Sequence, residues 1–193
     1  MRFDNQVILV TGAGSGIGAA SAKMFAARGA SLLINDLDTD ACHRVVETIE
    51  RTGGEASAVP GDVTEPAMPQ RLVAEAMERF GKLNVLVNNA GFTWDGMLHK
   101  MSDEQWQRIQ DLHTTAPFRL IRAVAQVWRP LAKAELAEGR VHPPRAIVNV
   151  SSTSGLHGNP GQINYATAKM GIIGMTKAAV SYTHLTLPTK RIV

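Results

Sequence analysis

The chain has 193 residues, 45% of them hydrophobic, which predicts one globular domain with a sizeable core. Its formal net charge is +3, and lysine and arginine are scattered among acidic residues, which argues against a nucleic-acid partner. The single cysteine, Cys42, excludes an internal disulfide and a CxxC metal site, and the six histidines show no zinc-binding spacing, so we expect no metal.

The N-terminal residues enter an apolar segment of ordinary strand length and lack the apolar region and cleavage site of a secretory signal. No stretch approaches the roughly 18 apolar residues that cross a bilayer. We therefore expect a cytoplasmic protein without a membrane partner.

A glycine-rich turn follows the first expected strand, residues 6–10, and leads into an alanine-rich helix that reaches residue 28. Strand, turn and helix in this order bring backbone amides close to a pyrophosphate at the positive helix N-terminus. Glycines also mark ordinary tight turns, so the run alone is weak evidence. The candidate cofactor-binding residues in this turn are Gly12, Gly14, Ser15, Gly16, Ile17 and Gly18.

A carboxylate stands at the end of the second expected strand, residues 31–35. Asp36 lies eighteen residues beyond Gly18, close to the place where an acidic residue receives the ribose hydroxyls of an adenine dinucleotide. A carboxylate there would repel a 2′-phosphate, and Ser15 supplies no compensating cation. The sequence therefore favours NAD over NADP.

Two further strands continue the alternating pattern. A helix over 37–52, in which Cys42 and His43 are ordinary side chains, precedes a strand at 56–59 and a helix at 64–80. Asp62, at the third strand end, either meets the adenine amino group or caps a turn. The fourth strand, 83–87, precedes the sequence NNAG, whose amides are expected to buttress the glycine turn.

A long helical region is expected from the N-cap Ser102 to about residue 138, with boundaries near Pro117 and Pro130. The fifth strand, residues 146–150, ends in a cluster of hydroxyl residues, and a glycine-rich loop leads to a helix that opens near Asn164 and reaches about residue 179.

Tyr165 and Lys169 are four residues apart on that last helix, so the phenol and the ammonium group share one face. A free phenol titrates near 10 and exchanges protons poorly at neutral pH, but a neighbouring cation favours its anion. An isolated pair of this kind is usually a surface aromatic beside a solvated lysine; the upstream motifs favour a chemical role.

Five apolar strands alternating with helices predict an α/β fold, a Rossmann-type doubly wound parallel sheet with helices on both faces. No internal repeat or linker divides the chain. We expect one dinucleotide-binding domain over residues 1–180, followed by residues 181–193 as a tail.

The ordered motifs resemble those of the classical short-chain dehydrogenase/reductase family, and in particular its bacterial 3-oxoacyl-acyl-carrier-protein reductase-like members. The similarity runs from about residue 3 to residue 179. It implies an NAD(P)-dependent oxidoreductase that interconverts a secondary alcohol and a ketone, and a parent enzyme that forms a tetramer or dimer. The motifs are TGAGSGIG, Asp36, Asp62-Val63, NNAG at residues 88–91, Ser152, and YATAK beginning at Tyr165.

The resemblance assigns a role to each matching position. Tyr165 would be the general acid in reduction and the general base in oxidation, and Ser152 would hold the substrate oxygen. Lys169 would bind the nicotinamide-ribose hydroxyls and favour the Tyr165 phenolate. Further cofactor-binding positions would be Asp62, Val63, Asn89, Ala90, Gly91, Tyr165 and Lys169.

Two departures from the family pattern stand out. His113 occupies the position of an asparagine that usually completes a catalytic tetrad. It either relays protons toward Lys169, with a pH dependence near neutrality, or is purely structural.

The second departure is the C-terminus, which lacks the family's sixth strand and resembles translated adapter sequence; the alternative is a short divergent tail. We expect a truncated chain with C-terminal strands missing, an uncovered sheet edge after strand five and an incomplete substrate pocket. A catalytically inactive dinucleotide-binding module is the competing function. The expected substrate is a small-molecule alcohol or ketone or an acyl thioester.

Overall fold

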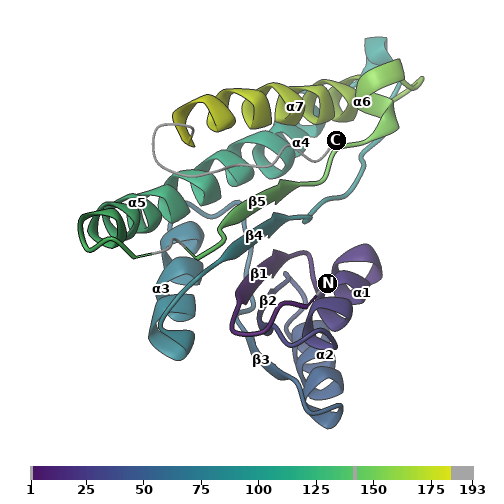
Figure 1. The fold of residues 1–193 in the computed structure, drawn as a ribbon. Coiled ribbons are helices and arrows are strands. Elements are labelled where there is room, and N and C mark those ends of the chain that lie inside the picture. Colours follow the sequence, from purple (N-terminus) through teal and green to yellow (C-terminus); the bar gives the residue numbers. More distant parts are fainter. Residues whose placement is uncertain (1, 141–142, 184–193) are drawn as a thin grey trace.

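The computed structural model describes residues 2–140 and 143–183, and its strands form one parallel sheet in the order β3-β2-β1-β4-β5 (Figure 1). This arrangement confirms the predicted Rossmann-type fold. Most of the expected tail, residues 184–193, lies outside the described residues. The strands are β1 (Val7–Thr11), β2 (Ser31–Asn35), β3 (Glu55–Ala58), β4 (Val85–Asn88) and β5 (Ala146–Asn149).

Helices follow each strand, as the alternating sequence pattern predicts. Those of the first half are α1 (Gly16–Ala26), α2 (Thr39–Arg51) and α3 (Met68–Phe80). Those of the second half are η1 (Leu98–Lys100), α4 (Asp103–Gln110), η2 (Asp111–Thr115), α5 (Ala116–Ala137), α6 (Thr153–His157) and α7 (Ile163–Thr183). Helix α7 extends about one turn beyond the expected end.

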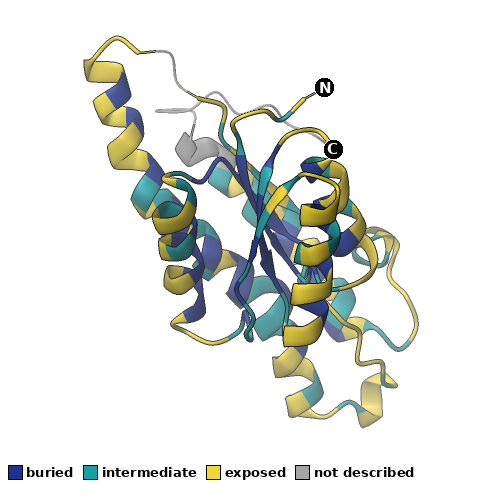
Figure 2. Ribbon diagram, turned by 90° about the horizontal axis from the view of Figure 1, so that it is seen from below, coloured by how far each residue is buried: buried dark blue, intermediate teal, exposed yellow. Residues whose placement is uncertain are grey.

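Alternate strand side chains enter two separate cores, one on each face of the sheet. Ile8 and Val10 of β1 pack with α1 and α2, whereas Val7 and Leu9 pack with α3 and α5. Figure 2 shows the same arrangement as buried strands between helices whose outer faces are exposed. Because both faces are covered, the inner strands can be apolar throughout, which is the pattern that the sequence displays.

Two helices, α3 and α5, differ from the expectation. Helix α3 begins at Met68 rather than at residue 64, because Asp62 forms a turn with Thr64 and the residue before Pro66 avoids helical geometry. Pro130 lies inside α5 instead of ending it. Trp128 and Ala132 on either side of that proline are buried, so packing compensates for the lost backbone hydrogen bond.

Two short helices were not expected, and one boundary has a different form. The segment after Ser152 is helix α6 rather than a loop, and η1 precedes α4. The expected break near Pro117 is η2, a π-helical turn between α4 and α5. Ser102 caps α4 as predicted, since its hydroxyl accepts a hydrogen bond from the Gln105 backbone amide and its own backbone N–H donates one to Gln105 Oε1.

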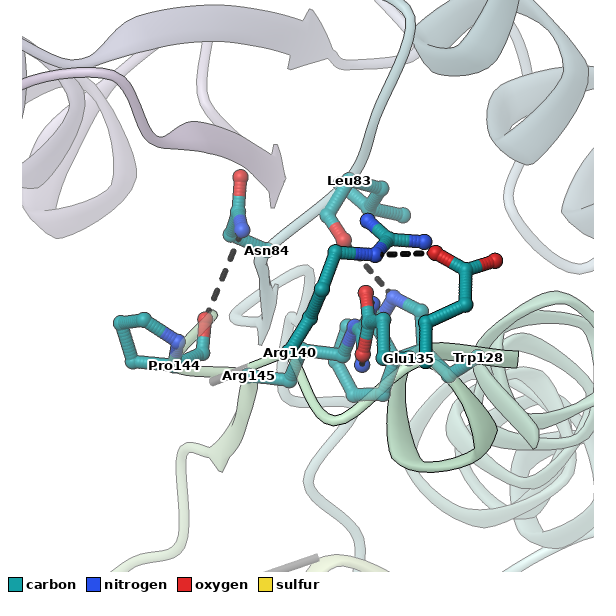
Figure 3. A network of polar contacts seen from close by, with 8 residues as sticks. Leu83, Asn84, Trp128, Glu135, Arg140, Pro144 and Arg145 are labelled. Carbon is teal, nitrogen blue, oxygen red and sulfur yellow. Dashed lines mark hydrogen bonds and ion pairs between the residues drawn. The ribbon is translucent and has the colours of Figure 1, made fainter. Parts of the chain in front are cut away.

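The amino ends of the strands are closed by a polar network (Figure 3). Arg145 donates two hydrogen bonds, of 2.9 and 2.6 Å, to the Glu135 carboxylate, and both side chains are over nine-tenths buried. The Trp128 indole N–H donates to the Leu83 carbonyl at 2.7 Å. These contacts join the end of α5 to the beginnings of β4 and β5.

Within the described residues, β5 pairs only with β4 and forms an edge of the sheet. Its Val148 side chain is 42% exposed, unlike the buried valines of β4. The uncovered edge expected after the fifth strand is therefore present in this part of the chain. No described helix has the length and apolar character needed to cross a membrane.

Candidate active site

A cavity of about 830 Å³ opens at the carboxyl ends of the strands, where parallel sheets commonly bind ligands. Gly12 and residues 15–18 line one side of it. Tyr165 and Lys169 of α7 line another. Two motifs about 150 residues apart in sequence thus face the same space, which is the juxtaposition that the sequence hypothesis requires.

Close packing explains why glycines occupy two positions of the turn. Gly12 has φ +62°, and a Cβ there would lie 2.6 Å from Ala90 Cα. A Cβ on Gly18 would overlap the Gly12 carbonyl oxygen. The Asn89 amide donates to the Thr11 and Gly12 carbonyls at 2.9 and 3.0 Å, so the expected buttressing by the NNAG segment is confirmed.

The turn also orients Asp36. Its Oδ2 accepts a hydrogen bond from Gly14 N at 2.9 Å, and its Oδ1 accepts one from Asp38 N at 3.1 Å. Asp36 lines the cavity but Gly14 does not. Gly14 therefore acts through the carboxylate it holds rather than by lining the cavity itself.

Asp62 satisfies the capping interpretation directly, since its Oδ1 accepts hydrogen bonds from the Thr64 amide and hydroxyl at 2.8 and 2.7 Å. Asp62 also lines the cavity, as do Val63, Ala90 and Gly91, so contact with an adenine stays a prediction.

Lys169 is 5% exposed, and its ammonium donates to the Val150 carbonyl at 2.7 Å. Burial lowers the pKa of Lys169 to about 8. The ammonium nitrogen lies 5.6 Å from the Tyr165 ring centroid, so the expected pairing of phenol and cation is present.

His113 forms the wall behind Tyr165. The two rings meet edge to face with centroids 5.0 Å apart, and the imidazole lies on η2. Its Nε2 is 2.8 Å from the Phe92 carbonyl, an acceptor, so the proton lies on Nε2. Nδ1 is buried, and no other described residue bonds to it.

Burial, and then the charge of Lys169, lowers the pKa of His113 to about 4. The imidazole is therefore neutral near pH 7. The pH dependence near neutrality that the sequence suggested for this residue does not follow, because the ring is shielded from water and faces a cation. Its contacts with Phe92 and Tyr165 match the structural alternative.

Ser152 caps α6, where its Oγ accepts a hydrogen bond from Ser154 N at 3.2 Å. It is not among the residues that line the cavity. Helix α6 nevertheless packs directly on α7, since a Cβ on Gly155 would lie 2.8 Å from the Lys169 carbonyl carbon. The hydrogen bond from Ser154 N uses one acceptor lone pair of the Ser152 hydroxyl and does not use its O–H donor.

Sequence reasoning missed several residues of the site. Thr11 is buried, and its hydroxyl accepts from Asn89 N and Ala90 N, which ties the glycine turn to the end of β4. Arg108 and Asp111 line the cavity. Arg108 and Asp111 are three residues apart and so share a helical face, but neither is three or four residues from His113, so the sequence spacing did not connect them with it.

The family model described as short chain dehydrogenase matches residues 6–184. The chain is 40% identical over 173 residues to a 3-oxoacyl-[acyl-carrier-protein] reductase of Synechocystis, covering 89% of this chain and 66% of the reductase. It is 40% identical over 184 residues to the peroxisomal multifunctional enzyme type 2 of Mus musculus, covering 91% of this chain and 23% of that enzyme.

Solved structures give the same result. A short chain dehydrogenase from Mycobacterium avium superimposes with a TM-score of 0.85 at 39% identity, over 92% of this chain and 63% of that one. A short chain dehydrogenase/reductase from Burkholderia phymatum in complex with NAD superimposes with a TM-score of 0.84 at 31% identity, over 92% of this chain and 60% of that one. The chain thus spans no more than about two thirds of these relatives.

Proposed function

The chain belongs to the short chain dehydrogenase family, and from that premise we propose an NAD-dependent oxidoreductase that interconverts a secondary alcohol and a ketone. The observation that carries this proposal is the single cavity lined by both the glycine turn and the Tyr165–Lys169 pair. We also propose, from the family resemblance, that residues 1–180 form the dinucleotide-binding domain of a cytoplasmic homo-oligomer.

Each candidate residue has a distinct chemical task in the proposed reaction. The bound nicotinamide would supply or accept the hydride at the carbinol carbon. Tyr165 gives its phenolic proton to the carbonyl oxygen in reduction and removes the hydroxyl proton in oxidation. Lys169, held by Val150, stabilises the phenolate, and the Ser152 hydroxyl donates a hydrogen bond to the same substrate oxygen.

Asp36 supports NAD as the preferred nucleotide. Two backbone amides hold both of its oxygens, so the carboxylate is fixed where it lines the cavity. A fixed carboxylate accepts hydrogen bonds from ribose hydroxyls and repels a 2′-phosphate.

We favour a 3-oxoacyl or 3-hydroxyacyl thioester as the substrate. Relatives are named 3-oxoacyl-[acyl-carrier-protein] reductase in Synechocystis and hydroxyacyl-CoA dehydrogenase in Mycobacterium tuberculosis. Phe92, which lines the cavity, is 44% exposed, and the nearby Trp94 is 38% exposed. Exposed aromatic side chains at a cavity can receive a hydrocarbon chain.

NADH binding, followed by fluorescence, and NADH oxidation with 3-oxoacyl thioesters and simple ketones test this function. We expect Tyr165→Phe to lower turnover by at least about 10²-fold, the range of general acid catalysis, while NADH binds with nearly unchanged affinity. Tyr182→Phe, which alters the chain's other tyrosine, is the matched control and should leave turnover unchanged. NADH binding without turnover in the parent chain would favour the inactive module and contradict the enzymatic proposal.

A further inference from the structure

We infer that Gln162 is a positioning residue that fastens the 92–97 loop to the turn carrying Ser152. The inference deepens the proposed function and depends on it for what the two segments do. Phe92 and Thr93 of this loop line the cavity, and Ser152 is the candidate ligand of the substrate oxygen.

The Gln162 carboxamide forms hydrogen bonds in two directions. Its Nε2 donates to the two carboxylate oxygens of Asp95, at 3.0 and 3.2 Å. Its Oε1 accepts from the Ser154 hydroxyl at 3.1 Å and from Asn159 Nδ2 at 3.0 Å. One side chain therefore joins the loop after β4 to helix α6.

A second set of contacts holds the same loop against the start of α7. Gly96 N donates to the Gly161 carbonyl at 2.8 Å. Asn164 is fully buried, and its Nδ2 donates to the Trp94 and Gln105 carbonyls at 3.1 and 3.2 Å. Because Asn164 directly precedes Tyr165, these contacts set the loop at a fixed place relative to the catalytic helix.

Gln162 acts on Ser152 through Ser154. The Ser154 amide donates to Ser152 Oγ, while the Ser154 hydroxyl bonds to Gln162. The residue that orients Ser152 is thus attached to the same carboxamide as Asp95. An amide is needed for this task because it donates to a carboxylate and accepts from a hydroxyl at once, whereas a glutamate can only accept at neutral pH.

A reciprocal exchange of side chains isolates this contact. Gln162→Glu sets two carboxylates against each other, and the double variant Asp95→Asn/Gln162→Glu restores an amide donor opposite a carboxylate. Asn159→Ala removes only the hydrogen bond from Asn159 to Gln162 and serves as the matched control.

Backbone amide hydrogen exchange of the 193-residue chain measures how firmly the two segments are held together, and it does not require enzymatic activity. A hydrogen bond to a charged group is stronger than one between neutral groups, and Gln162→Glu replaces it with a repulsion, so we expect this variant to speed exchange about tenfold. The increase should affect both residues 92–97 and 151–158, and the double variant should reverse it. Faster exchange in only one segment, or no reversal in the double variant, would overturn the inference.

Kinetics test the consequence for catalysis. In Gln162→Glu we expect kcat/KM for the ketone to fall about tenfold while the NADH Kd changes less than about twofold, with recovery in the double variant. An equal loss of NADH affinity would indicate a general structural defect and contradict a positioning role. If the parent chain binds NADH without turnover, the proposed function fails, and the exchange measurement still decides whether the segments are fastened.

Discussion

His113 illustrates how burial decides the chemistry of a single residue. From sequence, an imidazole in this position is a candidate proton relay. In the structure it is 2% exposed, donates to the Phe92 carbonyl and stands edge-on to Tyr165. The neutral His113 ring contacts the Tyr165 ring without adding a second charge beside it. This arrangement suits the proposed proton transfer, in which Lys169 is the cation.

The lowered pKa of His113 predicts a pH-dependent stability. Between about pH 6.5 and pH 4 the unfolded chain takes up a proton on this residue and the native chain does not, so the unfolding free energy falls as the pH falls. The loss should reach about 3 kcal/mol by pH 4. Urea unfolding at pH 7 and pH 4.5 measures this loss. The unfolding free energy should change less between the two pH values in His113→Gln than in the unsubstituted chain.

The exposed His43 provides the control for that measurement, because replacing it with glutamine removes a histidine without altering the cavity. If His43→Gln reduced the change in unfolding free energy between pH 7 and pH 4.5 as much as His113→Gln does, the assignment to His113 would be contradicted.

The elements around the site hold their side chains by local devices. The π-helical turn η2 lies between the α-helices α4 and α5 and places His113 at the cavity. Short π-helical turns of this kind are frequent at functional sites. The capping box of Ser102 and Gln105 starts α4, and Gln105 also offers its carbonyl to Asn164. The beginning of α4 and the beginning of α7 are therefore linked.

Ser102→Ala removes the hydroxyl that accepts the Gln105 amide, so the unfolding free energy should fall by about 1 kcal/mol. Ser102→Thr keeps an acceptor in the same place and should stay within a few tenths of the parent value. Urea unfolding of the three chains at pH 7 checks the prediction. If Ser102→Ala and Ser102→Thr lowered the unfolding free energy equally, the hydroxyl would not be the stabilising group.

At the scale of the whole molecule, the cavity is built from both halves of the chain. Asp36 and the glycine turn come from the first half, and Tyr165 and Lys169 come from α7. At the opposite end of the sheet, the network centred on Arg145 and Glu135 joins α5 to the beginnings of β4 and β5 (Figure 3). A nucleotide in the cavity would contact both halves and so resist unfolding of the whole domain.

Nucleotide binding should therefore raise the unfolding free energy, by about 2.7 kcal/mol at one hundred times Kd. At equal concentrations, NADH should raise the thermal midpoint more than NADPH, because Asp36 repels a 2′-phosphate. Asp36→Asn removes that charge and should narrow the difference. Thermal unfolding with each nucleotide measures the two midpoints. If NADPH raised the midpoint of the unsubstituted chain as much as NADH or more, the proposed preference for NADH would be refuted.

The sequence by itself determined the strands, the parallel fold class, the glycine turn with Asp36, and the Tyr165–Lys169 pair. These features depend on short-range rules, namely strand length, helical spacing and the backbone freedom of glycine, so a few adjacent residues suffice to reveal them.

Only the tertiary structure decided the neutral state of His113, the hydrogen bond from Gly14 to Asp36, and the hydrogen-bond partners of Gln162 and Asn164. It also kept Pro130 within α5. Each of these depends on burial or on partners up to 70 residues away, and such contacts exist only after the sheet has brought distant segments together.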